Sequence, residues 1–143
     1  TLVPTALEKM KRMLDKRQDV DFVYPDLRFG WKHFPGTDFD PEALKRMNYI
    51  HTSALLRRRA FPGFDEALKK FQDWDLWLTM VERGSKGIRI PEVLFSIKTR
   101  KTGYSHWLPK VAYRIPWPVF GWTPPEIIRY RRAEKIIREK HHL

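Results

Sequence analysis

The sequence has no cysteine among its 143 residues, which excludes a disulfide scaffold, a zinc ribbon and a thiol nucleophile. It also lacks a run of about 18 apolar residues, the length that a membrane-spanning helix requires. Glycine is scarce, with 7 residues, and the 11 prolines follow no period, which excludes collagen-like and low-complexity chains. The first ten residues lack the basic n-region and the apolar core of a signal peptide.

Acidic residues are few, since 17 Asp and Glu face 28 Lys and Arg, and the net charge is +11. So basic a chain is typical of proteins with a polyanionic partner, such as nucleic acid, anionic lipid or a phosphorylated small molecule. Most of the surplus, +8, lies from Ile97 onward, where eleven basic residues meet only Glu126, Glu134 and Glu139. The apolar fraction of 42% and the aromatic fraction of 14% argue against disorder, and the length fits one domain.

Hydrophobic periodicity predicts helices and strands that alternate along the chain. Predicted helices begin near Pro4, at Asp40 and at Asp73, and a basic amphipathic helix covers 126–142. Predicted strands cover 20–24, where Pro25 ends the strand, 52–56, and the pair 88–90 and 93–97, which Pro91 separates. Residues 27–40 are expected to form a loop, and most of 109–125 is expected to be irregular. This alternation predicts an α/β fold in which helices cover a sheet.

Five blocks of residues then occur in a fixed order along the chain. They are Asn-Tyr-Ile at 48–50, Ser-Ala-Leu-Leu-Arg-Arg at 53–58, Gly-Phe-Asp-Glu at 63–66, Gln-Asp-Trp-Asp-Leu-Trp-Leu at 72–78 and Ile-Pro-Glu-Val-Leu at 90–94. In this order they resemble the second half of a family 2 glycosyltransferase with the GT-A fold, and the resemblance covers about residues 1–105. It implies the C-terminal portion of a GT-A type mixed sheet flanked by helices, followed by the basic helix.

The resemblance also implies a domain organisation. Residues 1–108 correspond to the acceptor side of the catalytic domain, and residues 109–143 form a Pro- and aromatic-rich segment with the basic amphipathic helix. The family's nucleotide-binding half, with its metal-binding Asp-x-Asp, precedes the part that this chain resembles. We therefore expect a fragment that is inactive in isolation, and a divalent metal, Mg²⁺ or Mn²⁺, in the full-length enzyme.

Asp73 is the residue for which the resemblance implies catalysis. In the family, the Asp at this position is the general base, which takes the proton of an acceptor hydroxyl while the anomeric configuration inverts. A carboxylate at a helix N-terminus is held ionised by free backbone N–H groups, which suits that role. The structural alternative is a simple N-cap, because Asp is a favoured capping residue. Gln72 departs from the Glu that the family has before this Asp.

The resemblance implies further site residues with weaker support. Trp74, Asp65 and Glu66 are expected at the acceptor, where Trp74 would stack on a sugar, although Asp65 and Glu66 also suit a loop-shaping role. Arg100 is expected at the donor phosphates and His106 at the metal, and a solvated basic loop is the alternative for both.

Other residues are expected to be structural. Asp75 is expected to carry a helix-start charge or to pair with an Arg, and Trp77 is expected in the core. Arg57 to Arg59 are expected to form a strand-end charge cluster, although phosphate contact is a further interpretation. His141 and His142 are expected to lie in a frayed tail.

The C-terminal helix allows two interpretations. With Ile127, Ile128, Ile136 and Ile137 on an apolar side, it is expected either to lie on an anionic membrane surface or, as we favour, to pack on its own domain. The expected partners are a nucleotide-sugar donor and a saccharide or lipid-linked acceptor, with no nucleic acid. The expected location is the cytoplasm or the cytoplasmic face of a membrane. The alternatives to a transferase are a basic nucleic-acid-binding module and a non-catalytic interaction domain.

Overall fold

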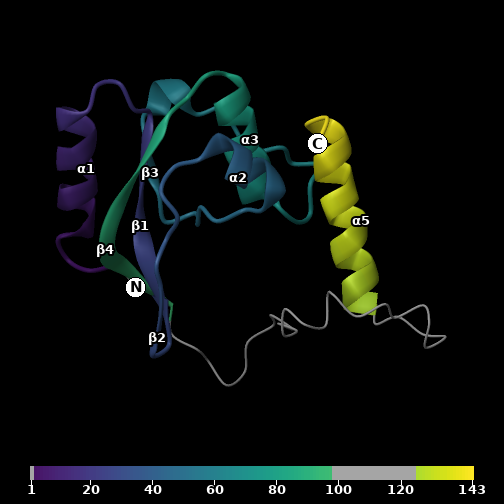
Figure 1. Cartoon of the computed structure of the whole chain (residues 1–143), viewed down its shortest axis with the longest axis horizontal. Helices are drawn as coiled ribbons and strands as arrows, with labels where there is room; N and C mark the ends of the chain where they lie inside the picture. The colour runs from purple at the N-terminus through teal and green to yellow at the C-terminus, as the bar shows by residue number, and fades with distance from the viewer. Residues whose placement is uncertain (1, 98–124) are drawn as a thin grey trace.

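The computed structural model describes residues 2–97 and 125–143. Its elements follow in the order α1 (Ala6–Lys16), β1 (Phe22–Phe29), β2 (Lys32–Phe34), α2 (Pro41–Arg46), β3 (Leu55–Leu56), the short η1 (Arg58–Ala60), α3 (Gln72–Glu82), β4 (Gly87–Ile97) and α5 (Pro125–Lys140). Figure 1 shows α1 on one side of the sheet and α2 and α3 on the other, with α5 beyond them. The predicted α/β class, with helices flanking a mixed sheet, is confirmed at this level.

Strand β1 is the centre of the four-stranded sheet. It pairs in parallel with β4 along its whole length, from Phe22 to Phe29. Its other edge is shared by two short antiparallel strands, β3 at Phe22 and β2 at Phe29. The parallel pair requires a long crossover, and the segment that contains α2 and α3 supplies it.

Three predicted strands have other bounds in the structure. Strand β3 covers only Leu55–Leu56 of the predicted 52–56, and the other two main differences lie at prolines. Strand β1 does not end at Pro25 but continues to Phe29, so the expected loop 27–40 contains the hairpin of β1 and β2. Strand β4 is continuous through Pro91 rather than broken there. The register passes from the pair Pro25–Ile90 to the pair Asp26–Val93, so Pro91 lies in a bulge. A bulged residue needs no ladder hydrogen bond, and a proline is tolerated there.

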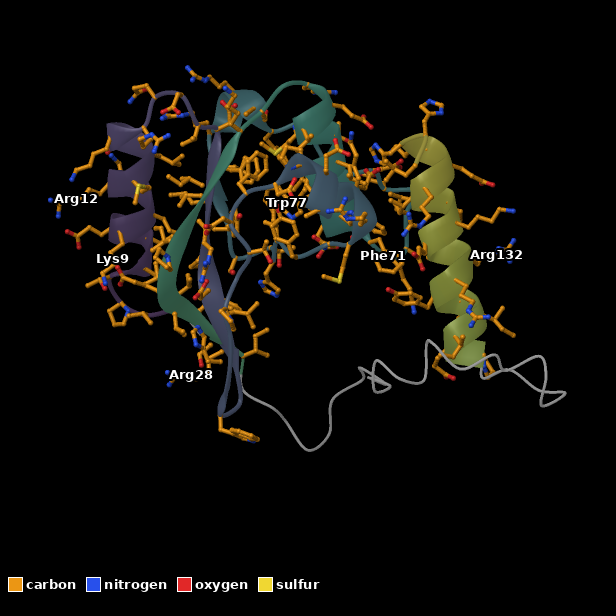
Figure 2. The ribbon with its side chains drawn as sticks, viewed as in Figure 1. Lys9, Arg12, Arg28, Phe71, Trp77 and Arg132 are labelled. Atoms are coloured by element: carbon orange, nitrogen blue, oxygen red, sulfur yellow. The ribbon has the colours of Figure 1, made fainter. Side chains whose placement is uncertain are left out.

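The sheet buries a hydrophobic cluster on each face. Alternation along β1 directs Phe22 and Tyr24 to one face and Val23 to the other. The Val23 face packs against α1, and the opposite face packs against α2, α3 and the end of α5. Figure 2 shows Trp77 between the sheet and the α2 and α3 layer, where it is fully buried. The prediction that Trp77 lies in the core is confirmed.

Helix α5 does not present its four isoleucines on one side, as the sequence analysis expected. Ile127 and Ile137 are fully buried, whereas Ile128 is 53% exposed and Ile136 is 45% exposed. The helical rotation of about 100° per residue separates the two pairs. Ile137 belongs to the cluster on the α3 face of the sheet, so the C-terminal half of α5 packs on its own domain. Within the described ranges no helix is long and apolar enough to cross a membrane.

Candidate active site

Asp73 lies in the first turn of α3, but it is not the N-cap. The cap position is Phe71, whose backbone is left-handed with φ 60° and whose side chain caps nothing. The Asp73 carboxylate is instead held by two donors. Its Oδ1 accepts from the Trp74 backbone N–H at 2.9 Å, and its Oδ2 accepts from the Asn48 amide at 3.0 Å. The capping interpretation of Asp73 is therefore wrong, and the carboxylate is fixed in direction at the positive end of the helix.

The segment between α2 and β3 brings the Asn48 side chain to Asp73 and places His51 within reach of its charge. Asn48 donates from Nδ2 to Asp73, while its Oδ1 accepts from the Ile50 N–H at 3.2 Å. His51 receives the Ser53 backbone N–H on Nδ1 at 3.1 Å. Burial lowers the pKa of the His51 imidazole below its usual 6.5, and the negative charge of Asp73 opposes that shift. The neutral form of the His51 imidazole is therefore favoured.

The core anchors this segment. The Trp77 indole N–H donates to the Ile50 carbonyl at 3.0 Å, and Ile50 is buried. The His51 ring lies 5.3 Å, centre to centre, from the ring of Phe95 on β4. These contacts hold Asn48 and His51 in place relative to α3 through backbone and ring packing.

Trp74 does not have the acceptor-stacking role expected of it. Only 3% of the residue is exposed, and its indole N–H donates to the Leu44 carbonyl at 2.8 Å. The Arg138 guanidinium from α5 lies 5.7 Å from its ring centre. The expectation is wrong because Trp74 follows Asp73 on the helix and points to the face that α2 and α5 cover. No ring face is open to a sugar.

Asp75 lies two residues from Asp73 and has an entirely different environment. Its side chain is buried, and Oδ1 lies 2.8 Å from His141 Nε2 and 2.8 Å from Lys140 Nζ. The other ring nitrogen of His141 lies 2.7 Å from the Glu82 carboxylate. The partners of Asp75 are thus a histidine and a lysine of the C-terminal segment, not an Arg. His141 is only 6% exposed, so the expectation of a frayed tail is wrong for this residue.

Asp65 and Glu66 do not join Asp73. Asp65 accepts from the Ala67 N–H at 3.0 Å and pairs with Lys140 at 2.7 Å. The Lys140 hydrogen bond, aided by the Ala67 N–H, holds the pKa of the Asp65 carboxyl below its usual value. Lys140 bridges Asp65 to Asp75. Asp65 is therefore part of the charge network around Asp75, and it shapes the loop in which it lies. Glu66 is exposed.

Two arginines have structural roles that the sequence left open or did not indicate. Arg57 donates to the carbonyls of Leu14 and Val20 near the C-terminus of α1, so its guanidinium has a structural role there. Arg89 of β4 forms a two-point contact with buried Asp26, at 2.7 and 3.0 Å. Burial alone would raise the pKa of Asp26, but the hydrogen bonds from Arg89, the Gly36 N–H and His33 together lower it.

Arg100 and His106 lie outside the described residues. In residues 2–97 and 125–143, no three His, Asp or Glu side chains are grouped to hold a metal ion. The carboxylates of Asp73 and Asp75 each accept N–H donors already and face different partners. Asp73 and Asp75 therefore offer no joint set of ligands to a divalent cation.

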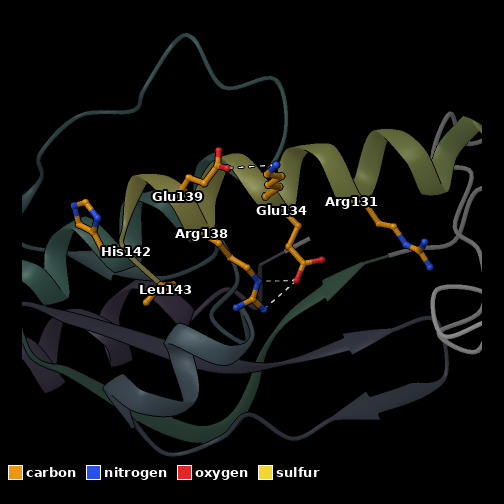
Figure 3. A pocket seen from close by; sticks show the side chains of 7 residues that line it. Arg131, Glu134, Arg138, Glu139, His142 and Leu143 are labelled. Carbon is orange, nitrogen blue, oxygen red and sulfur yellow. Dashed lines mark hydrogen bonds and ion pairs between the residues drawn. The ribbon is translucent and has the colours of Figure 1, made fainter.

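Figure 3 shows an open hollow along α5, lined by Arg131, Glu134, Lys135, Arg138, Glu139, His142 and Leu143. Arg138 pairs with Glu134 at 3.0 Å, and Lys135 pairs with Glu139 at 3.5 Å. Because opposite charges alternate along it, the hollow is not a single-sign binding surface, and the residues around Asp73 remain the better candidate site.

The sequence analysis missed Asn48, His51 and His141 as partners in these sites. Asn48 opens the first block of the glycosyltransferase resemblance, which was the available signal, whereas nothing in the pattern pointed to His51 or His141. No protein-family model matches the chain, and no curated protein matches it either.

Proposed function

We propose that this chain is the acceptor side of an inverting glycosyltransferase, with Asp73 as the general base. The observation that carries the proposal is the Asp73 carboxylate, fixed by Asn48 and the Trp74 N–H in the first turn of α3. The ordered blocks that resemble family 2 glycosyltransferases have their base at this same position. The α/β architecture is compatible with a GT-A portion.

In the proposed reaction the acceptor oxygen attacks the anomeric carbon of a nucleotide-sugar. The acceptor O–H bond breaks and its proton passes to an Asp73 oxygen. The bond from the anomeric carbon to the diphosphate breaks, and the nucleoside diphosphate leaves with the electron pair. Attack from the opposite side inverts the configuration. A base must first be positioned within hydrogen-bond reach of the hydroxyl, and the two donors to Asp73 provide that fixed direction.

The donor side of the proposal rests on the resemblance alone. The family binds the nucleotide and its divalent metal, Mg²⁺ or Mn²⁺, with residues that precede the portion resembled here, and Arg100 would meet the diphosphate. The acceptor in this proposal is a saccharide, free or lipid-linked. The same proposal includes a location in the cytoplasm or at the cytoplasmic face of a membrane. The exposed Ile128 and Ile136 of α5 are the support for contact with a membrane.

The basic charge has a rival explanation in nucleic-acid binding. Figure 2 shows Lys9 and Arg12 projecting from α1 and Arg132 projecting from α5, on opposite sides of the molecule. A nucleic-acid interface gathers its basic residues on one face or along one groove, and these three residues do not form such a face.

The test is a substitution in the complete gene product, including any residues that precede Thr1. We expect Asp73→Asn to abolish release of nucleoside diphosphate from UDP- and GDP-hexoses with saccharide acceptors, because an amide cannot accept the proton. The circular dichroism spectrum should stay unchanged. Asp15→Asn is the matched control, since Asp15 is exposed on α1 and pairs only with Lys11.

Near-normal turnover by Asp73→Asn would refute the base assignment. Oligonucleotide binding with a steep salt dependence, unaffected by Asp73→Asn, would instead support the nucleic-acid-binding class. Absence of both activities would support a non-catalytic interaction domain.

A further inference from the structure

Helix α3 begins after a residue with an unusual backbone. Phe71, directly before α3, has φ 60° and ψ 25°, a left-handed conformation that a bulky side chain rarely adopts. Among the described residues, His142 is the other non-glycine residue with a positive φ, but it follows the end of α5, where this conformation is common. The Phe71 side chain makes no capping hydrogen bond, so its packing has to hold the strained backbone in place.

This backbone sets the direction of the turn that carries Asp73. The Phe71 carbonyl accepts the Asp75 N–H at 2.9 Å, the hydrogen bond that closes the first turn of α3. Asp73 lies within this turn, and its Oδ2 is 3.0 Å from the Asn48 amide. A change of φ at Phe71 would rotate the start of the helix and with it the Asp73 carboxylate. The direction of the proposed base therefore depends on Phe71.

Two aromatic rings contact Phe71. Between ring centres, Phe71 lies 5.8 Å from Trp74, at 75°, and 5.0 Å from Tyr130, at 80°. Both are edge-to-face pairs, an attractive arrangement of aromatic rings. Trp74 belongs to the same turn of α3, whereas Tyr130 comes from α5, and Figure 2 shows Phe71 between the two helices. The contact with Tyr130 thus joins the strained residue to α5.

Three further side chains of the C-terminal segment contact the same turn. The Arg138 guanidinium lies 5.7 Å from the centre of the Trp74 ring. Lys140 Nζ and His141 Nε2 each lie 2.8 Å from Asp75 Oδ1. The C-terminal segment therefore contacts this turn on both sides of position 73 in the sequence.

The contacts between α5 and α3 are mostly polar or aromatic. Ile137 is the residue of α5 that joins the hydrophobic cluster on this face of the sheet, and the buried Ile127 belongs to neither cluster. The other contacts described above pair rings or charged groups. A segment with few buried apolar contacts opens at a lower free energy than the core does. Helix α5 can therefore separate from α3 while the sheet stays folded.

We propose that α5 is a strap that holds the first turn of α3, and that the transferase is active only while α5 is docked. Tyr130 fixes Phe71 in its left-handed conformation, and Phe71 is the positioning residue that directs Asp73. When α5 separates, the backbone of Phe71 relaxes, the turn rotates and the carboxylate loses its direction. The inference rests on the proposed function, and it adds the regulation of that site.

Hydrogen exchange tests the strap without any measurement of turnover. Tyr130→Ala removes the ring that contacts Phe71, and Tyr130→Phe keeps it. We expect Tyr130→Ala to speed exchange of the Asp75 amide by about tenfold or more while the β1 amides keep their rates, and Tyr130→Phe to exchange as the wild type does. Met10→Ala, in the cluster on the opposite face of the sheet, is the control for lost packing and should not speed the Asp75 amide selectively. A wild-type exchange rate of this amide in Tyr130→Ala would overturn the strap.

Turnover of the complete gene product tests whether the strap governs the site. At a temperature at which circular dichroism shows the variants folded, Tyr130→Ala should lower kcat by about tenfold, with KM for the acceptor within about twofold. Tyr130→Phe should keep the wild-type kcat. A merely structural role would lower thermal stability without this split between kcat and KM. A wild-type kcat in folded Tyr130→Ala would refute the regulation.

Phe71→Gly tests whether the coupling passes through Phe71. Glycine adopts φ 60° without strain, and it offers Tyr130 no ring to contact. We expect Tyr130→Ala to change kcat by less than about twofold in the Phe71→Gly background, against about tenfold in the wild type. Equal losses in the two backgrounds would contradict the role of Phe71.

These outcomes are distinct from those of the proposed function. Full turnover by Asp73→Asn refutes that function, and the exchange rate of the Asp75 amide still decides whether α5 holds the turn. An inactive Asp73→Asn together with a wild-type kcat in Tyr130→Ala supports the function and refutes the strap.

Discussion

Asp73 and Asp75 are the same residue type, two positions apart on one helix, yet they lie in opposite surroundings. Asp73 is half-buried and held by one side-chain amide and one backbone N–H. Asp75 is buried and held by His141 and Lys140, which also reach Glu82 and Asp65. Position 73 lies beside the loop before β3, whereas position 75 faces the C-terminal segment. The helix separates the two carboxylates by about 200° of rotation.

The difference shows how one helix turn can carry a group available for chemistry next to one that holds the fold. A buried carboxylate that pairs with a lysine and a histidine is committed to them, since losing a charged partner leaves an uncompensated charge. A carboxylate with only neutral donors is oriented but not neutralised, so it can still accept a proton from a substrate. The acceptor-side chemistry is therefore expected at Asp73, and stability is expected to depend on Asp75.

The strongest test of this comparison makes the same substitution at both positions. Asp75→Asn should lower the free energy of unfolding by about 3–5 kcal/mol, because it removes the buried carboxylate that Lys140 and His141 share. Asp73→Asn should lower it by about 1 kcal/mol or less, since the amide oxygen can still accept from Asn48. Urea unfolding of the two variants measures the difference, and equal losses would contradict the comparison.

His141 and His142 are adjacent near the C-terminus, and substituting each of them tests the surroundings of Asp75 from its partner's position. His141→Gln should lower the free energy of unfolding by about 2–3 kcal/mol, because Gln cannot place donors on both Asp75 and Glu82. His142→Gln, which changes an exposed residue, should cost less than about 0.5 kcal/mol. Native-state hydrogen exchange should also show faster exchange of the α5 amides in His141→Gln alone. Unchanged exchange in that variant would show that His141 does not hold α5.

A substitution of Gln72 tests how the N-terminus of α3, next to Asp73, is held in place. Its amide donates to the Leu68 carbonyl at 2.7 Å, which a Glu cannot do when ionised. Gln72→Glu introduces the residue that the resembled family has at this position. It should lower the free energy of unfolding by about 0.5–1 kcal/mol, because the helix dipole offsets only part of the lost hydrogen bond. Thermal unfolding of this variant measures the effect, beside Gln18→Glu, which loses the same kind of amide-to-carbonyl hydrogen bond at an exposed site. A gain in stability would show that the Leu68 contact contributes nothing.

The smallest expected effect is a pH dependence at His51. Because burial lowers the pKa of this imidazole below 6.5, the unfolded chain binds the proton more readily than the folded chain. The contribution of His51 to stability is therefore complete above about pH 6.5 and is lost as the pH falls toward the lower folded pKa. His51→Gln should show a smaller loss of stability between pH 7.5 and 5.0 than the wild type in urea unfolding. Parallel losses would contradict the neutral assignment.

Much of the fold was accessible from the sequence because it depends on short-range patterns. The spacing of Leu7, Met10 and Leu14 predicted α1, and the Asp-Pro start at Asp40 predicted α2, where Asp40 indeed caps the Glu42 N–H at 2.9 Å. The core position of Trp77 also followed from helical spacing. The strands were predicted less well, since Pro25 and Pro91 read as strand ends and a bulge depends on the register between β1 and β4.

The candidate site was accessible only in part. Asp73 was indicated by its place in an ordered set of blocks, but its donors were not, since Asn48 lies 25 positions away. Trp74 and Asp65 were expected at the acceptor and lie elsewhere. Their partners, Leu44 and Lys140, come from other elements, and no local pattern records such contacts.

By itself, the sequence determined the α/β class, the approximate places of the helices and the charge, because propensity, periodicity and composition act over a few neighbouring residues. Only the tertiary structure decided that Asp73 faces Asn48 while Asp75 is buried against His141. The physical reason is that the environment of a side chain is made by residues far away in the chain. It exists only once the sheet, α3 and α5 have packed together.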